Sequence, residues 1–179
     1  MESTMNRKDW FFLHEMKTQC EFAVLAFEDL ELPGFSAGLG RFWFSIQSFL
    51  VAVGNISKIL WPSDGRYAER GERLRLLLGI TDASPIQCRS FRNYFEHFDE
   101  RLEKWFAIPH PRDIVDRNIG PIRTLGGLDA KHFLRNYAFD VHALFFQGER
   151  YDLVPVCEEV KTLLSKASAL LNAPFSSGM

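Results

Sequence analysis

The chain has 179 residues, of which 46% are hydrophobic and 25% are charged, and its formal net charge is −2. This length and composition are typical of a soluble globular protein with a substantial core, so we expect a single domain over residues 1–179. A net charge so close to zero excludes a strong overall attraction to nucleic acid, and any RNA binding would need a local basic patch.

The cysteines and the first residues bear on the cellular compartment. Cys20, Cys88 and Cys157 are odd in number and widely spaced, which suits neither a disulfide framework nor a zinc site and favours a reducing environment. Residues 1–8 are polar, and no secretory signal is indicated. The most hydrophobic stretch, residues 42–61, is interrupted by polar side chains and does not fit a membrane span. We therefore predict a cytoplasmic protein without a membrane partner, with residues 42–61 in a central buried helix.

Three helices are predicted in the first half of the chain. Apolar residues recur every three or four positions over residues 7–30, which predicts a long amphipathic helix that Pro33 and Gly34 end. A second apolar stripe predicts a helix over residues 35–60, and a turn rich in Pro, Ser, Asp and Gly follows it. A shorter helix is predicted over residues 69–78.

A fourth helix is predicted to begin at Ser84 and Pro85. The serine side chain can accept a hydrogen bond from an unpaired backbone N–H, and proline at the first helical position loses no needed donor. Large apolar side chains then follow at spacings of three and four, which predicts one continuous helix over residues 84–106 with this stripe facing a core. The stripe consists of Phe91, Tyr94, Phe95, Phe98, Leu102, Trp105 and Phe106.

The C-terminal part changes character. Pro and Gly are frequent after Ile108, which predicts an extended connection. Alternation and aromatic content favour strands over about residues 131–153, with a tight turn at Gln147–Glu149, so we predict a small β-hairpin or a three-strand meander. A helix over residues 130–146 is the competing interpretation.

A last helix is predicted over residues 152–171, and the small, polar tail over residues 172–179 is expected to fray. The fold class is therefore mainly α, a bundle of four to five helices with a small β-hairpin or meander before the last helix.

Arg92, Asn93 and His97 are the residues that suggest chemistry. On an ideal helix Asn93 and His97 share a face, whereas Arg92 is displaced from His97 by about 140° and reaches it only through its long side chain. One helix alone makes a poor site. Two such helices packed across a symmetric dimer would bring two copies of all three residues to one cleft.

The segment Arg92-Asn93-Tyr94-Phe95-Glu96-His97 resembles the R-x4-6-H motif of the HEPN superfamily (higher eukaryotes and prokaryotes nucleotide-binding), in which Asn, Asp or His often follows the arginine. The resemblance implies an HEPN-like helical bundle that forms a homodimer and, in many members, acts as a metal-independent ribonuclease. Only this segment carries matching residues, and the β-hairpin departs from a minimal HEPN bundle.

In such a dimer a neutral His97 would take the proton from a ribose 2′-OH, and the partner's protonated His97 would give one to the leaving oxygen. Arg92 would stabilise the charged phosphorane, and Asn93 would orient the phosphate or the imidazole. This scheme requires neither a metal nor another cofactor. The alternative is that His97 is an exposed helix residue and that Arg92 pairs with Glu96.

A local excess of arginine precedes the motif. These arginines form the predicted contact surface for an RNA backbone, and a solvated helix face with internal ion pairs is the alternative. Acidic residues outnumber basic ones from Glu96 to Asp116, and such a rim repels phosphates. The predicted RNA-binding residues are Arg66, Arg70, Arg73, Arg75 and Arg89.

Two classes of function remain open. The first is a metal-independent endoribonuclease of the toxin or phage-defence kind, which would act on RNA as a dimer and be held in check by a cognate antitoxin protein. The second is a non-catalytic, HEPN-like dimeric module that binds a partner protein or a ligand.

Overall fold

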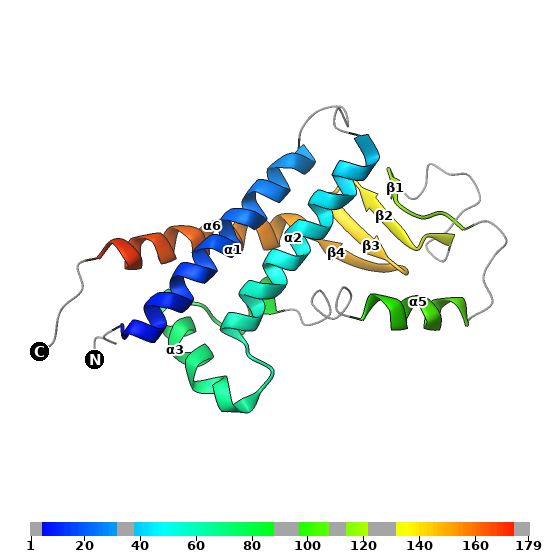
Figure 1. Ribbon diagram of the computed structural model, residues 1–179. Helices are drawn as coiled ribbons and strands as arrows, with labels where there is room; N and C mark the ends of the chain where they lie inside the picture. Colours follow the sequence, from blue (N-terminus) through cyan, green and yellow to red (C-terminus); the bar gives the residue numbers. More distant parts are fainter. Residues whose placement is uncertain (1–4, 32–37, 88–96, 108–113, 122–131, 174–179) are drawn as a thin grey trace, which may run out of the picture. The chain divides into compact units, whose positions relative to one another are not determined.

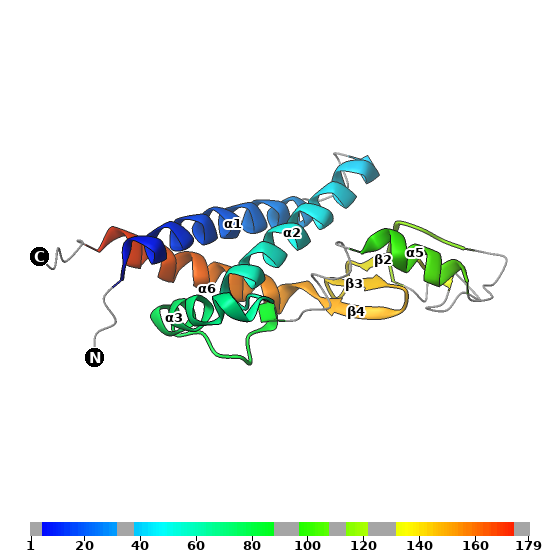
Figure 2. The same cartoon turned by 60° about the horizontal axis from the view of Figure 1, so that its bottom comes forward.

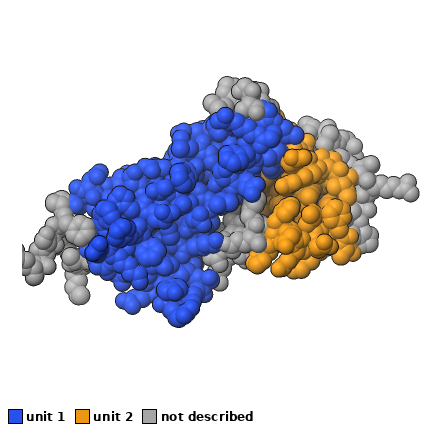
Figure 3. Space-filling model, viewed as in Figure 1, with its two compact units in different colours: residues 1–92, 157–179 blue, residues 93–156 orange. Residues whose placement is uncertain are grey.

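A computed structural model of the chain describes residues 5–31, 38–87, 97–107, 114–121 and 132–173. The chain forms two compact units (Figure 3), one made of residues 1–92 and 157–179 and the other of residues 93–156. The prediction of one domain over the whole chain stays a prediction.

The first unit consists of helices. These are α1 (Arg7–Glu31), α2 (Gly38–Leu60), α3 (Ala68–Leu78) and the part of α6 (Leu153–Asn172) from Cys157 onwards (Figure 1). Helices α1 and α2 are antiparallel neighbours, since Gln19 bonds Asn55 near one end of the pair and Asp29 bonds Ser45 near the other. Helix α6 lies against this pair, with α3 nearby (Figure 2). The helices predicted in this unit are confirmed, although residues 35–37 lie outside the described residues.

The core of the first unit is built from the apolar stripes that the sequence displays. The apolar stripes predicted over residues 7–30 and 35–60 are buried, because their residues return to the same side of the helix every three or four positions. The buried stripe of α2 consists of Phe42, Ile46, Phe49, Leu50, Val53, Ile56 and Leu60. Helix α6 buries Val160, Leu163 and Ala167 in the same way. The buried stripe of α1 consists of Leu13, Met16, Cys20, Ala23, Phe27 and Leu30.

An ion pair joins α3 to the start of α1. The side chain of Asn6 accepts from the backbone N–H of Asp9, and Asp9 accepts from the N–H of Asn6, which caps the helix reciprocally. Asp9 is fully buried and also accepts from Nε and Nη2 of Arg73 at 2.7 to 2.9 Å. Nearby, a Cβ at Gly71 would lie 2.6 Å from the carbonyl oxygen of Leu60, so glycine is what permits the close approach of α3 and α2.

The second unit contains a four-stranded sheet and a short helix. Strands β1 (Asn118–Ile119), β2 (Arg135–Ala138), β3 (Ala143–Phe146) and β4 (Glu149–Asp152) lie in the order β1-β2-β3-β4, with β1 parallel to β2 and the other pairs antiparallel. The turn residues between β3 and β4, Gln147 and Gly148, both have positive φ, as a two-residue hairpin requires.

These strands confirm the predicted three-strand meander, and the helical interpretation is wrong for residues 135–146. Strand β1 was not predicted. Its pairing with β2 depends on a segment that lies far along the chain, which local periodicity does not show.

The predicted continuous helix over residues 84–106 is wrong. Pro85–Gln87 is a single 3₁₀ turn, and His97 has φ −125° and ψ 38°, which is not helical, so α5 (Phe98–Phe106) begins only after it. The reason is tertiary: the ring of Phe98 packs on Phe146 of the sheet with centroids 6.1 Å apart, and the Arg135 guanidinium lies 5.4 Å from the same ring. The chain is thus mainly helical with a small sheet before the last helix, as predicted.

Candidate functional site

The predicted catalytic residues are only partly described. Arg92 and Asn93 lie outside the described residues, as does Arg89 of the predicted RNA-binding surface. The His97 side chain is 56% exposed, and its Nδ1 lies 3.6 Å from a carboxylate oxygen of Glu100 in the first turn of α5. Because His97 is not helical, the ideal-helix spacing that placed it beside Asn93 does not apply.

Among the described residues of the predicted RNA-binding surface, Arg66 is the exposed one. Its side chain is 79% exposed and its guanidinium forks onto Asp64 at 2.6 to 3.1 Å. These bonds hold the pKa of the Asp64 carboxyl below its ordinary value and raise the pKa of Arg66. Arg66 therefore keeps a solvent-facing charge, but that charge is already paired.

The other described arginines of this stretch are turned toward their own protein. Arg73 donates to the buried Asp9, which raises the pKa of the Arg73 guanidinium. Arg75 donates to the Leu60 carbonyl and lies over the ring of Trp61. Arg70 lies 4.4 Å from the centroid of the Phe12 ring. These three guanidinium groups thus help to hold α1, α2 and α3 together.

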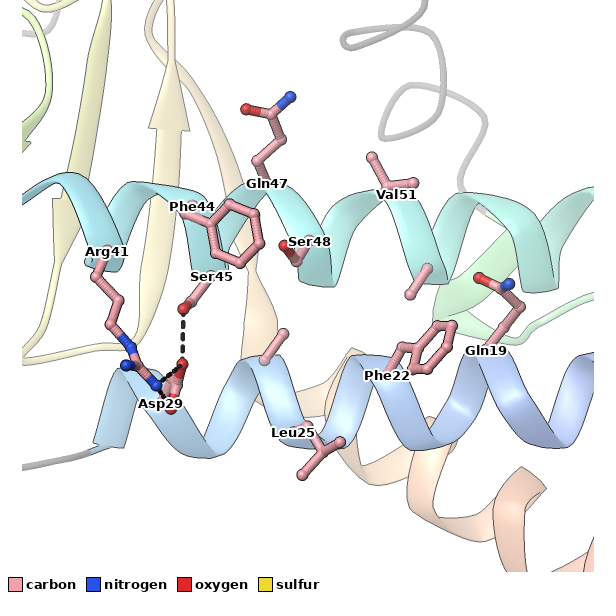
Figure 4. A pocket seen from close by; sticks show the side chains of 12 residues that line it. Gln19, Phe22, Leu25, Asp29, Arg41, Phe44, Ser45, Gln47, Ser48 and Val51 are labelled. Atoms are coloured by element: carbon pink, nitrogen blue, oxygen red, sulfur yellow. Dashed lines mark hydrogen bonds and ion pairs between the residues drawn. The ribbon is translucent and has the colours of Figure 1, made fainter.

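A groove runs along the outer side of the α1–α2 pair (Figure 4). Its volume is about 670 Å³, and all its walls come from these two helices. We call it the α1–α2 groove. It is lined by Gln19, Phe22, Leu25, Ala26 and Asp29 of α1 and by Arg41, Phe44, Ser45, Gln47, Ser48, Val51 and Ala52 of α2.

The surface of the α1–α2 groove is apolar to an unusual degree for an exposed face. Phe22 is 53% exposed, Leu25 63%, Phe44 69% and Val51 48%. Scattered single apolar residues are common on protein surfaces, but four large ones around one groove form a contiguous patch. Such patches are typical of binding surfaces.

Polar groups bracket the groove along its length. Near one end Asp29 accepts from Ser45 Oγ at 3.0 Å and from Arg41 at 3.4 Å, as Figure 4 shows. Near the other, the Asn55 amide donates to Gln19 at 3.1 Å. No histidine or cysteine stands among the described lining residues, and the carboxylate there is already compensated. This arrangement suits the binding of an apolar surface better than acid–base chemistry.

The sequence contains a signal for this groove. Phe44, Ser48, Val51 and Asn55 step by four, three and four, a second helical stripe offset from the core stripe of α2. Phe11, Phe22 and Leu25 lie on a similar second stripe of α1. Large apolar residues on a second, partly polar face of a helix indicate a surface that a partner can cover.

The two described cysteines are not candidates for catalysis. Cys20 and Cys157 are both buried and not disulfide-bonded. Burial raises the pKa of the Cys20 thiol to about 12 and that of Cys157 to about 11, so neither is a thiolate near neutral pH. Within the described ranges, no group of three or more His, Cys, Asp or Glu side chains is placed to hold a metal ion.

Helix α2 has the length and composition of a membrane span, with a mean hydropathy of 1.2 in its most apolar window. However, 67% of that window is buried inside the protein, which is typical of the core helix of a soluble protein. This agrees with the prediction that residues 42–61 form a central helix.

Comparison of the chain with models of known protein families, with curated protein sequences and with solved structures found no match. The resemblance to the HEPN superfamily stays a prediction that rests on the segment from Arg92 to His97.

Proposed function

We propose that this chain is a protein-interaction module that binds an apolar helical surface in the α1–α2 groove. The observation that carries the proposal is the patch of Phe22, Leu25, Phe44 and Val51, all about half exposed or more, around one groove. Exposing this much apolar surface to water is unfavourable by about 25 cal/mol per Å², and a partner that covers it recovers that free energy.

The shape of the groove favours a helix as its occupant. Two antiparallel helices form a long trough, and side chains of a docked helix fill it at spacings of three, four and seven residues. The polar groups at Asp29–Arg41 and Gln19–Asn55 bracket the apolar centre and would fix the register of the partner.

The test is a photo-cross-linking experiment in cells. A benzoylphenylalanine is placed at Phe44, in the groove, and as a matched control at Leu76, which is 78% exposed on α3 and does not line the groove. We expect one discrete covalent adduct from position 44 and none of that size from position 76. If position 44 gives no adduct, the module function is wrong.

A second candidate is the metal-independent endoribonuclease that the HEPN resemblance implies, with Arg92, Asn93 and His97 contributed by two subunits. The supporting observation is that the His97 imidazole is 56% exposed and can be reached by a substrate. A carboxylate oxygen of Glu100 lies 3.6 Å from its Nδ1.

This second candidate predicts cleavage of total RNA by the purified chain in EDTA, and loss of cleavage in both His97→Ala and Arg92→Ala. A His14→Ala variant is the matched control, because His14 is an exposed histidine on α1. An inert wild type, or variants that cleave equally well, would exclude catalysis by this motif.

A further inference from the structure

The two helices of the α1–α2 groove carry complementary groups at matching levels. Asp29 on α1 and Arg41 on α2 lie across from each other, 3.4 Å apart, near one end of the groove. Gln19 on α1 and Asn55 on α2 lie across from each other near the opposite end. At each of these two positions along the groove, one member of the bonded pair lies on α1 and the other lies on α2.

This pattern is self-complementary about a twofold axis that runs along the groove. Such an axis places α1 over the partner's α2, so that Asp29 faces the partner's Arg41 and Arg41 faces the partner's Asp29. Gln19 and the partner's Asn55 meet in the same way. An axis across the groove would instead place the Asp29–Arg41 pair of one copy against the uncharged Gln19 and Asn55 of the other, so that no ion pair forms between the copies.

The apolar residues fit the same axis. From the register of the two helices, Val51 lies near the level of Phe22. The axis along the groove therefore sets Phe22 of each copy against the partner's Val51. By the same register Phe44 lies near the level of Asp29, and Leu25 lies between the levels of Phe22 and Asp29. Large side chains from α1 would meet large side chains from α2, which is how facing helices fill the space between them.

If both helices take part over their whole length, the face is close in size to one side of a standard interface. Helices α1 and α2 have 25 and 23 residues. At a rise of 1.5 Å per residue and a helix width of about 10 Å, the pair presents a face of about 35 by 20 Å, or about 700 Å². A standard interface buries about 800 Å² on each partner. Every helix in the resulting four-helix bundle would have antiparallel neighbours, which the helix dipoles favour.

On these grounds, and resting on the interaction function proposed above, we infer that the occupant of the α1–α2 groove is a second copy of this chain. The two copies form an antiparallel four-helix bundle about a twofold axis along the groove. Phe22, Leu25, Phe44 and Val51 form its apolar centre, and Asp29 and Arg41 form reciprocal ion pairs that select this axis.

The first test is sedimentation equilibrium of the full chain. We expect the wild type to be a dimer, and Phe44→Asp to raise the dissociation constant about 30-fold or more, because it puts a charge at the centre of the interface. Leu76→Asp should leave the constant unchanged, because Leu76 is an exposed apolar residue outside the groove. Circular dichroism checks that both variants are folded. A monomeric wild type, or a dimer insensitive to Phe44→Asp, would overturn the inference.

The second test addresses the axis by mixing two charge-swapped chains. Asp29→Arg alone places four arginines at one end of the bundle, and Arg41→Asp alone places four aspartates there, so each variant should self-associate about tenfold more weakly than the wild type. An equimolar mixture should form heterodimers, since every arginine then faces an aspartate of the other chain. No preference for the heterodimer would rule out the axis along the groove.

The cross-linking experiment separates the failure of this inference from the failure of the module function. An adduct from position 44 with twice the mass of the chain supports both. An adduct with a different protein keeps the module function but overturns the homodimer. No adduct overturns both.

Discussion

The inner and outer sides of the α1–α2 pair can be compared directly, because the same two helices carry large apolar residues on both. On the inner side Phe49 is fully buried, and its ring centroid lies 5.6 Å from that of Phe27. On the outer side Phe44, five residues earlier on the same helix, is 69% exposed. A phenylalanine that recurs with helical spacing thus marks an apolar face of the helix. Whether that face belongs to the core or to a binding surface depends on which elements pack against it.

The largest expected difference in the free energy of unfolding is between two single variants, Phe49→Ala on the inner side and Phe44→Ala on the outer side. Phe49→Ala should lower the free energy of unfolding by about 3–5 kcal/mol, because it removes a filled position and leaves a cavity. Phe44→Ala should cost less than about 0.5 kcal/mol in dilute solution, where the chain is monomeric, since no cavity forms at an exposed site.

Urea unfolding at two protein concentrations measures this difference. The loss from Phe44→Ala should grow as the concentration rises, because it acts through association rather than through the monomer core. A large loss from Phe44→Ala that is independent of concentration would contradict the distinction between the two sides.

The arginines of the predicted RNA-binding surface extend the comparison to charged side chains. Arg73→Ala should lower the free energy of unfolding by about 3 kcal/mol, because Asp9 is fully buried and would be left without its partner. Arg66→Ala should change it by less than about 0.5 kcal/mol, since the ion pair of Arg66 is at the surface. Chemical unfolding of the two variants side by side measures the difference, and equal losses would exclude the structural role of Arg73.

The smallest effect concerns the buried thiol of Cys20 and depends on pH. Its pKa is raised from 9.0 to about 12 in the folded chain. Above pH 9 the unfolded chain therefore releases this proton while the folded chain keeps it, so the contribution of Cys20 to stability is present below pH 9 and is lost as the pH rises toward 12. The loss approaches about 1.4 kcal/mol per pH unit.

A Cys20→Ala variant provides the control for this prediction. Removing the thiol creates a small cavity whose cost does not depend on pH, so the variant should be less stable at pH 7 but lose less stability between pH 9 and pH 10. Unfolding curves at the three pH values measure the slopes. Parallel slopes for variant and wild type would show that Cys20 is not protected in the folded state.

Part of the α1–α2 groove could be predicted from the sequence. The second stripe of α2, from Phe44 to Asn55, is visible as a helical period, and the partners Asp29 and Arg41 lie at its end. The core stripe of α2 could be told from the second one, because it is apolar throughout while the second includes Ser48 and Asn55. What the sequence could not supply was that the second stripe of α2 lies beside Phe22 and Leu25 of α1 and forms one groove with them. The prediction of a site at the motif from Arg92 to His97 was limited by an assumption about the backbone. Its spacing assumed a helix through His97, and the backbone at His97 is not helical.

The sequence by itself determined the helices α1, α2, α3 and α6 and the core stripes of α1 and α2, and it favoured strands over a helix for β2 to β4, because helical and strand periods depend on residues a few positions apart. Tertiary structure alone decided three further features. It set the start of α5 at Phe98, where the ring meets the sheet, paired β1 with β2, and turned Arg73 toward Asp9, 64 residues away. Each depends on contact between segments distant along the chain, and such contacts leave no period in the sequence.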